Sequence, residues 1–201
     1  MKLDEHFRIF KTEKYRERSA IKRFLLKRFL KKINRLFVSC QPHRVLEIGC
    51  GEGFVLGFLS TLHPEVKYLG IDIDSQQLKL LKEHFPTIIT SQEDIINTDP
   101  AGKNFDLVLA IEVLEHINDY QKALNNISQF SNKYILISVP WEPAFRLSNL
   151  LRGKNIKRWG NDIEHVNNWS KKKITKIVSD YFNIIRAEIS FPWTVILAQK
   201  K

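Results

Sequence analysis

Three glycines at alternate positions, Gly49, Gly51 and Gly53, follow directly on a short apolar run at residues 45–48. Glycine permits both a sharp turn and a backbone that approaches a ligand too closely for a Cβ atom. Helical periodicity starts at once after Gly53, so the turn joins a strand to a helix whose first N–H groups face the same point. The sequence therefore predicts a strand–turn–helix unit that binds a ligand at its turn.

Short apolar runs alternate with helical stretches along the middle of the chain. The runs lie at residues 44–48, 67–71, 87–90, 105–110 and 133–139, and helices are predicted at 53–62, 75–84 and 119–130. Short runs rich in β-branched residues are typical of buried parallel strands. With right-handed crossovers they predict an α/β fold, a doubly wound, Rossmann-like and mostly parallel sheet with helices on both faces.

The end of the chain breaks this alternation. After a predicted helix at 171–181, two extended runs at 182–191 and 193–199 are separated only by Pro192. A connection this short fits an antiparallel hairpin and not a parallel crossover. The sheet should therefore end in one antiparallel C-terminal strand.

An amphipathic helix is predicted at residues 14–37. Its apolar face carries Ile21, Leu25, Phe29, Ile33 and Leu36, and its opposite arc carries Arg23, Lys27, Lys31, Asn34 and Arg35. An apolar face of this length must be covered. We expect it to pack over the ligand crevice, which in such a fold lies beyond the C-terminal ends of the strands. Docking on a membrane surface or on a partner is the alternative.

The net charge of +10 is distributed unevenly over the 201 residues. Residues 1–40 hold 13 Lys and Arg against 4 Asp and Glu, residues 41–145 hold 7 against 14, and residues 146–176 hold 9 against 2. Two basic segments that share one surface would attract an anionic partner. Separate solvated faces are the other interpretation.

The length fits a single domain with room for a core. We divide residues 1–201 into a basic N-terminal helical cap at 1–40, a ligand-binding core at 41–140, a substrate-side insertion at 141–170 and a C-terminal helix with a β-hairpin at 171–201.

Neither a membrane span nor a disulfide framework is predicted. No apolar run approaches the roughly 20 residues that cross a bilayer, and the N-terminus lacks the apolar core of a secretory signal. The two cysteines, Cys40 and Cys50, are too few for a disulfide framework or a four-ligand zinc site. These features predict a cytoplasmic protein.

An acidic residue ends the second predicted strand. Asp72 follows Gly53 by 19 residues, and a carboxylate at this point can accept hydrogen bonds from both hydroxyls of a ribose. Asp74 is expected to cap the helix at 75–84. The glycine turn and the acid together predict a site for a ligand that contains a nucleoside.

These motifs resemble those of the class I S-adenosylmethionine-dependent methyltransferases over residues 43–140. The family pattern Glu/Asp-x-Gly-x-Gly-x-Gly is met by Glu47 and the three glycines, the ribose acid falls on Asp72, and the third-strand acid falls on Asp94. The segment 105–117 is similar to the branch that methylates small molecules and lipids. The resemblance implies that S-adenosylmethionine binds here and leaves as S-adenosylhomocysteine. It implies cofactor contacts from Glu47, Gly49, Cys50, Gly51, Gly53, Asp72, Ile73, Asp94, Ile95 and Ile111.

Binding of a dinucleotide is the alternative for the same turn. A dinucleotide site more usually shows Gly-x-Gly-x-x-Gly, whereas the third glycine here comes one residue early. Glu52 also stands where it would repel a pyrophosphate.

Methyl transfer from a sulfonium depends mainly on alignment of two partners and exclusion of water. An alcohol or phenol acceptor gains from a general base, and His116 and His165 are the candidates. Family members that modify amino groups of nucleobases or glutamine typically carry Asn/Asp-Pro-Pro-Tyr/Phe after the fourth strand, where residues 110–113 read Ala-Ile-Glu-Val. We therefore predict an oxygen acceptor, ahead of a carbon.

A divalent metal site is an alternative use of the same segment. Glu112 and His116 stand four residues apart beside Glu115, a spacing that places such side chains on one helical turn. His165 falls where a related histidine occurs in metal-assisted ubiquinone-pathway enzymes and small-RNA 2′-O-methyltransferases. Because Glu-x-x-Glu-His is widespread in the family without a metal, both interpretations stay open.

Aromatic and basic residues alternate in the insertion at 141–170. We expect Trp141, Arg146, Trp159 and Trp169 to contact the substrate. Such a mixture binds an amphipathic anion, or stacks bases beside a charged groove.

The sequence thus favours a methyltransferase that acts on a small or lipid-linked anionic acceptor. The first alternative is an RNA 2′-O-methyltransferase with a divalent metal, although no RNA-binding module is recognisable. The second is a cofactor-binding protein without catalysis. The basic N-terminal helix adds an expected peripheral contact with a membrane surface.

Overall fold

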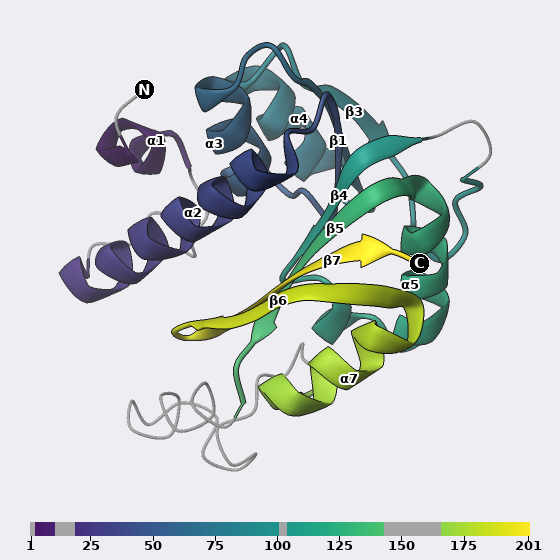
Figure 1. Ribbon diagram of the computed structural model, residues 1–201. Helices are drawn as coiled ribbons and strands as arrows, with labels where there is room; N and C mark the ends of the chain where they lie inside the picture. Colours follow the sequence, from purple (N-terminus) through teal and green to yellow (C-terminus); the bar gives the residue numbers. More distant parts are fainter. Residues whose placement is uncertain (1–2, 11–18, 101–103, 143–165) are drawn as a thin grey trace.

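A seven-stranded sheet in the order β3-β2-β1-β4-β5-β7-β6 forms the centre of the computed structural model, which describes residues 3–10, 19–100, 104–142 and 166–201 (Figure 1). Its strands are β1 (Arg44–Ile48), β2 (Lys67–Asp72), β3 (Ile89–Gln92), β4 (Phe105–Ile111), β5 (Ser131–Pro140), β6 (Phe182–Ser190) and β7 (Trp193–Lys200). Strands β1 to β5 pair in parallel, and β7 runs antiparallel to both β5 and β6. The prediction of a mostly parallel sheet with one reversed C-terminal strand is confirmed.

Helices cover both faces of this sheet, as predicted. They are α1 (Leu3–Ile9), α2 (Ala20–Cys40), α3 (Phe54–Leu62), α4 (Ser75–His84), α5 (Tyr120–Phe130), α7 (Lys171–Tyr181) and the 3-10 helix η1 (Leu114–His116). Buried residues of α1 to α4 form one hydrophobic cluster with the sheet, and those of α5 and α7 form a second cluster on the other face. No helix in the described ranges combines the length and the apolar character needed to cross a membrane.

The apolar face of α2 packs on the sheet itself. Leu30, Ile33 and Leu36 are buried in the same cluster as the strand residues Val45 and Leu136. From Leu26 to Cys40 this face therefore covers the sheet and not the ligand crevice, whereas Ile21, expected on the same face, is 73% exposed. The physical reason is the area of sheet that has to be covered, because the nine residues of α3 are too few to cover β4, β5 and β7 on this face.

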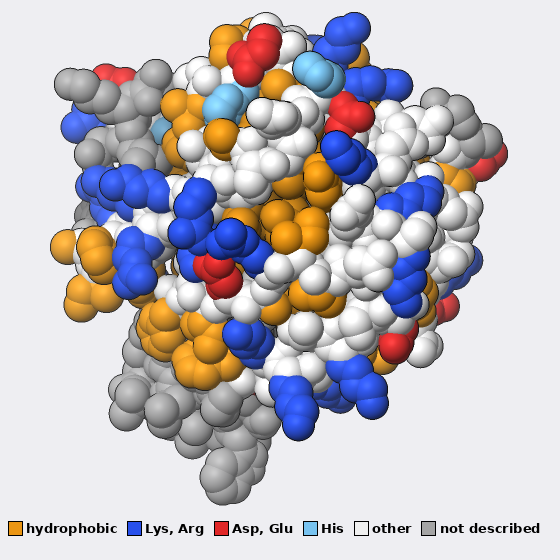
Figure 2. Space-filling model, viewed as in Figure 1, with side chains coloured by type: hydrophobic (Ala, Val, Ile, Leu, Met, Phe, Trp, Pro, Cys, Tyr) orange, Lys and Arg blue, Asp and Glu red, His pale blue; other side chains and the backbone are white. Residues whose placement is uncertain are grey.

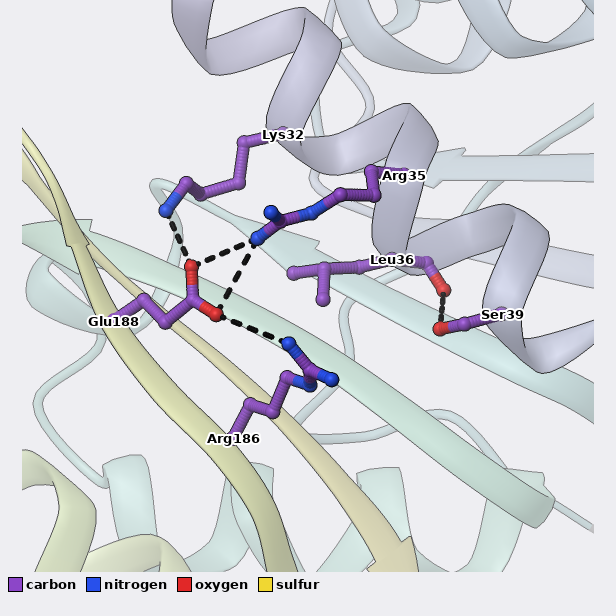
Figure 3. A network of polar contacts seen from close by, with 6 residues as sticks. All are labelled: Lys32, Arg35, Leu36, Ser39, Arg186 and Glu188. Carbon is purple, nitrogen blue, oxygen red and sulfur yellow. Dashed lines mark hydrogen bonds and ion pairs between the residues drawn. The ribbon is translucent and has the colours of Figure 1, made fainter.

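The polar side of α2 is tied to the hairpin by one acidic residue. Glu188 on β6 accepts a hydrogen bond from Lys32 Nζ and one from Arg35 Nη2 at 2.9 Å, and Arg186 Nη1 lies 3.6 Å from its other oxygen (Figure 3). The hydrogen bond from Lys32, followed by the charges of the three cations, lowers the pKa of Glu188 below its ordinary value. These contacts hold the middle of α2 against β6.

Candidate functional site

The glycine turn lies between β1 and α3, at the carboxyl edge of the sheet. Gly49, Gly51 and Gly53 have φ values of 63°, 51° and 87°, in the left-handed region that favours glycine. A Cβ atom at Gly49 would lie 2.5 Å from Cγ2 of Val113, which follows β4. The backbone of the turn at Gly49 therefore passes directly against Val113, a contact with protein that was not predicted from the sequence.

Backbone hydrogen bonds fix the course of this turn. The N–H of Cys50 donates to the carbonyl of Ile71 at 3.1 Å, and the N–H of Gly53 donates to the carbonyl of Cys50 at 2.9 Å. The thiol of Cys50 is buried, and this burial, together with the nearby carboxyls of Glu47 and Asp72, raises its pKa. Cys50 thus contributes a compact side chain under the turn.

Asp72 ends β2 and joins two parts of the site. Its Oδ2 accepts a hydrogen bond from the N–H of Gly51 at 2.8 Å, and its Oδ1 accepts one from the N–H of Asp74 at 2.9 Å. Each carboxylate oxygen keeps a second lone pair, so the side chain can still accept hydroxyl donors. Asp74 accepts hydrogen bonds from the N–H groups of Gln76 and Gln77, which confirms its predicted role as the cap of α4.

Glu47 places a carboxyl group beneath the turn. Its side chain is 3% exposed, and its Oε2 has no hydrogen-bond partner among the described residues. Burial raises the pKa of Glu47 well above its ordinary value, a backbone hydrogen bond from Leu56 opposes this, and the charge of Asp72 adds to it. A cationic group near the turn would favour the ionised form of this carboxyl.

The segment after β3 lies next to Asp72. The N–H of Glu93 donates to the carbonyl of Asp72 at 3.1 Å. Asp94 is exposed, and its two oxygens accept hydrogen bonds from the N–H of Ile96 and from Asn97 Nδ2 within its own turn. Two of the predicted apolar contact residues differ in exposure. Ile95 is buried in the core, whereas Ile73 is 70% exposed beside Asp72.

The segment after β4 closes the site on the side of β5. Glu112 has a φ of 58°, donates its N–H to the carbonyl of Ser138 at 3.0 Å, and accepts a hydrogen bond from Ser138 Oγ at 3.3 Å. Ile111 is buried at 9% exposure, and His116 is exposed at the end of η1. Val113 contacts the glycine turn, and His116 follows it by three residues along the chain.

The predicted metal ligands are not brought together in the described part of the chain. No group of three His, Cys, Asp or Glu side chains there is arranged to hold a metal ion. The spacing argument assumed one α-helical turn, but Glu112 has a left-handed backbone and residues 114–116 form a 3-10 helix. Glu115 is buried, and its carbonyl accepts hydrogen bonds from the N–H groups of Val166 and Asn167. His165 lies outside the described residues.

The two described tryptophans of the insertion have different surroundings. The Trp169 ring is 3% exposed and packs edge-on against Tyr120 at 5.2 Å between centroids, so the structure places it in the core. Trp141 is half-buried beyond the end of β5. Arg146 and Trp159 lie outside the described residues.

Phe191 in the hairpin turn was not predicted to belong to this edge. The N–H of Trp141 donates to the carbonyl of Pro192 at 2.8 Å, and the rings of Trp141 and Phe191 meet edge-on at 6.3 Å. Phe191 is 45% exposed. The signal in the sequence was an aromatic residue next to Pro192 in the short turn between the two extended runs. That Phe191 contacts Trp141 at the end of β5 could be seen only in three dimensions.

Comparisons with known proteins point to one family. The family described as "Methyltransferase domain" matches residues 14–182. An O-methyltransferase of Pyrenophora dematioidea is 29% identical over 106 residues, which cover 50% of this chain and 39% of that protein. A ubiquinone biosynthesis O-methyltransferase of Paraburkholderia phymatum is 33% identical over 86 residues, which cover 40% and 36%. The chain thus spans about two fifths of the length of these relatives.

A solved structure shares the fold over nearly the whole chain. The crystal structure of magnesium protoporphyrin IX methyltransferase from Synechocystis PCC 6803 with bound SAH has a TM-score of 0.73 and 16% sequence identity, and the match covers 98% of this chain and 94% of that one. The family match spans the glycine turn, Asp72 and the whole parallel sheet. The chain therefore belongs to the methyltransferase domain family, as the resemblance to class I S-adenosylmethionine-dependent methyltransferases predicts.

Proposed function

We propose that the protein is a methyltransferase that uses S-adenosylmethionine. The observation that carries the proposal is the hydrogen bond between Asp72 and Gly51, which sets a carboxylate suited to a ribose against a glycine turn that is open at Gly51. The exposed side chain of Ile73 adds an apolar surface beside that carboxylate, suited to the flat face of a base.

The residues around the turn fit a cationic cofactor better than a dinucleotide. Glu47 and Glu52 are both buried, at 3% and 2% exposure. Two carboxyl groups so close to the turn would repel a pyrophosphate, whereas the sulfonium and ammonium groups of S-adenosylmethionine would favour the ionised form of Glu47. The free Oε2 of Glu47 is available for such a contact.

When bound, S-adenosylmethionine supplies an activated methyl group. The chain then has to hold the cofactor, exclude water and align an acceptor in line with the breaking bond. Asp72 and the glycine turn hold the nucleoside end, and Val113 packs against Gly49 on the side of β4. His116 is the described candidate for a base that takes a proton from an acceptor hydroxyl, and His165 remains a candidate by sequence.

We further propose an oxygen acceptor on a small or lipid-linked anionic molecule. The O-methyltransferase of Pyrenophora dematioidea supports the choice of oxygen. The half-buried Trp141 and the exposed Phe191, which meet at the end of β5, support an acceptor with an apolar part. The basic side chains of α2 support an anionic part.

Calorimetry and a labelling experiment test this function. The purified protein is titrated with S-adenosylhomocysteine and, separately, with NAD, and only the first should bind. The protein is then incubated with methyl-labelled cofactor and a cell extract separated into lipid, small-molecule and RNA fractions, with and without a chelator. Label in the lipid or small-molecule fraction supports the proposal, and label that appears only in RNA and only without chelator supports the RNA alternative. Binding of S-adenosylhomocysteine without label in any fraction would favour a non-catalytic protein.

A further inference from the structure

The outward face of α2 exposes apolar side chains at its N-terminal end. Ile21 is 73% exposed and Phe24 is 58% exposed, although both belong to a helix whose opposite face is buried in the core. The guanidinium of Arg28 lies 5.8 Å from the centre of the Phe24 ring. An apolar pair is thus presented to solvent next to a cation.

The same face of α2 carries positive charge along its length. The helix holds seven Lys and Arg and no Asp or Glu. Phe24, Arg28, Lys31 and Arg35 recur at intervals of four, three and four residues, so they form one row opposite the buried face. Glu188, which faces α2 from β6, is already engaged by three cations, and the face therefore keeps a net positive charge.

This row reaches the edge of the sheet where the candidate site lies. A helix of 21 residues is roughly 31 Å long, whereas the five residues of β1 span roughly 16 Å. Because α2 ends just before β1 begins, its N-terminal half must extend past the carboxyl ends of the strands, as Figure 1 shows. The contact between Phe29 and Trp193, with ring centroids 4.6 Å apart, places this half of the helix beside the hairpin turn.

The hairpin turn exposes further apolar side chains at that edge. Ile189 is 39% exposed and Phe191 is 45% exposed. Figure 2 shows apolar and basic side chains gathered together on the face formed by α2 and the hairpin. The edge thus combines apolar side chains that can enter a lipid layer with cations that lie at the level of anionic headgroups.

We propose that this edge docks on an anionic phospholipid membrane, with Ile21 and Phe24 inserted among the lipids and Arg28 and Lys31 against the headgroups. A bilayer accommodates both kinds of side chain at once, whereas a nucleic acid backbone would use the cations alone. Docking in this orientation turns the carboxyl edge of the sheet towards the membrane. If the proposed methyl transfer is correct, a lipid-linked acceptor would reach the site from this side.

Vesicle sedimentation with the full chain tests the docking, without cofactor or acceptor. Wild-type protein should sediment with vesicles of phosphatidylglycerol and phosphatidylcholine, and not with phosphatidylcholine alone. Binding should weaken as salt rises, because the contribution of the cations is screened. The double variant Arg28→Gln/Lys31→Gln should bind these vesicles at least roughly tenfold more weakly, since each cation near an anionic surface contributes a factor of about five.

The apolar contribution is tested by Ile21→Asp/Phe24→Asp, with Val38→Asp as the matched control. Val38 is 50% exposed on the same helix but lies roughly 21 Å further along it, away from the docking edge. The double variant should lose most vesicle binding, whereas Val38→Asp should bind as wild type does. Circular dichroism and S-adenosylhomocysteine binding serve as the folding check for each variant.

Two results would overturn the proposal: no sedimentation of the wild type with anionic vesicles, whether or not the protein binds single-stranded RNA, or equal sedimentation of Ile21→Asp/Phe24→Asp and Val38→Asp. Since these measurements involve no methyl transfer, docking can fail while the proposed enzyme activity stands, and the reverse is equally visible.

Discussion

The Oδ2 atom of Asp72 accepts a hydrogen bond from the backbone N–H of Gly51 at 2.8 Å. This single contact connects the end of β2 to the middle of the glycine turn, so the acid and the turn keep a fixed distance. A ligand that binds both Asp72 and the turn therefore finds them already in place, so that less conformational entropy is lost on binding.

Replacing Asp72 and Asp74 separately should distinguish cofactor binding from helix capping. Asp72→Ala should weaken S-adenosylhomocysteine binding roughly 10- to 100-fold, because hydrogen bonds to a charged group contribute about 1.5 to 3 kcal/mol. Asp74→Ala removes the cap of α4 and should lower the free energy of unfolding by about 1 kcal/mol, with cofactor affinity nearly unchanged. Calorimetry and urea denaturation measure the two effects. Equal loss of affinity in both variants would contradict the assignment of Asp72.

Gly49→Ala should destabilise the chain more than Gly51→Ala does. Both glycines have positive φ, so either alanine is strained by about 1 kcal/mol or more. Only at Gly49 would the new Cβ also meet Val113 at 2.5 Å, and the β-branched side chain of Val113 has little freedom to move away. We expect an extra loss of about 1 to 2 kcal/mol in urea denaturation without ligand. The double variant Gly49→Ala/Val113→Ala should recover this extra loss, and an unchanged deficit would show that contact with Val113 is not its cause.

The local signals of the sequence were sufficient for the sheet and the glycine turn. The alternation of short apolar runs and helices predicts β1 to β5, most directly β1 and β4, which are almost entirely buried. Pro192 between two extended runs predicts the hairpin. The cap at Asp74 is also a local signal, since an acidic residue before a helix has few other roles. These features depend on residues that are near one another along the chain.

Features that depend on distant residues could not be predicted in the same way. The placement of α2 on the sheet depends on how much of the sheet the other helices leave open, which no local pattern states. Trp169 shares its aromatic character with Trp141, yet one ring is in the core and the other lies at the edge. The spacing of Glu112 and His116 was misleading because the backbone between them is not an α-helix.

The ion cluster around Glu188 should make stability depend on pH in the acid range. Its pKa is lowered in the folded state, so its contribution is present above its ordinary value of 4.5 and is lost as pH falls below that value. Glu188→Gln should therefore lower the free energy of unfolding by up to about 1 kcal/mol near neutral pH. The difference between variant and wild type should shrink at acid pH and at high salt. A difference that is constant with pH would mean that packing, and not charge, is lost in the variant.

The two cysteines should react slowly in the folded protein. Both thiols are buried, and burial raises the pKa of Cys40 to about 11 and raises that of Cys50 further. Since the thiolate is the reactive form, labelling by a thiol reagent should be far slower than in urea-unfolded protein, where both react freely. Cofactor binding should slow the labelling of Cys50 further while Cys40 is unaffected. Rapid labelling of Cys50 in the folded state would contradict its role as a compact, inert side chain under the turn.

His6 should make the attachment of α1 sensitive to acid. Its side chain is fully buried among Phe7, Phe10, Phe54 and Phe85, and its Nε2 lies 2.7 Å from the carbonyl of Phe54. The opposite nitrogen, Nδ1, has no hydrogen-bond partner among the described residues, so protonation there would place a charge against aromatic rings. Burial accordingly lowers the pKa of His6 from 6.5 to about 4, although the hydrogen bond to Phe54 opposes the shift.

Because the pKa of His6 is lower in the folded than in the unfolded protein, the neutral side chain contributes fully to the free energy of unfolding above pH 6.5. That contribution is lost as pH falls from about 6.5 to about 4. The loss should amount to about 2 to 3 kcal/mol over this range. His6→Phe removes the titrating group but keeps an aromatic ring among its neighbours, so its free energy of unfolding should decline less steeply over the same pH range than that of wild type. Urea denaturation at successive pH values measures the two slopes, and the other titrating groups are common to both proteins. Equal slopes would mean that α1 separates from α3 without unfolding the rest, because His6 would then be protonated in solvent before the core responds. Hydrogen exchange would reveal that local opening as early exchange at the amides of α1.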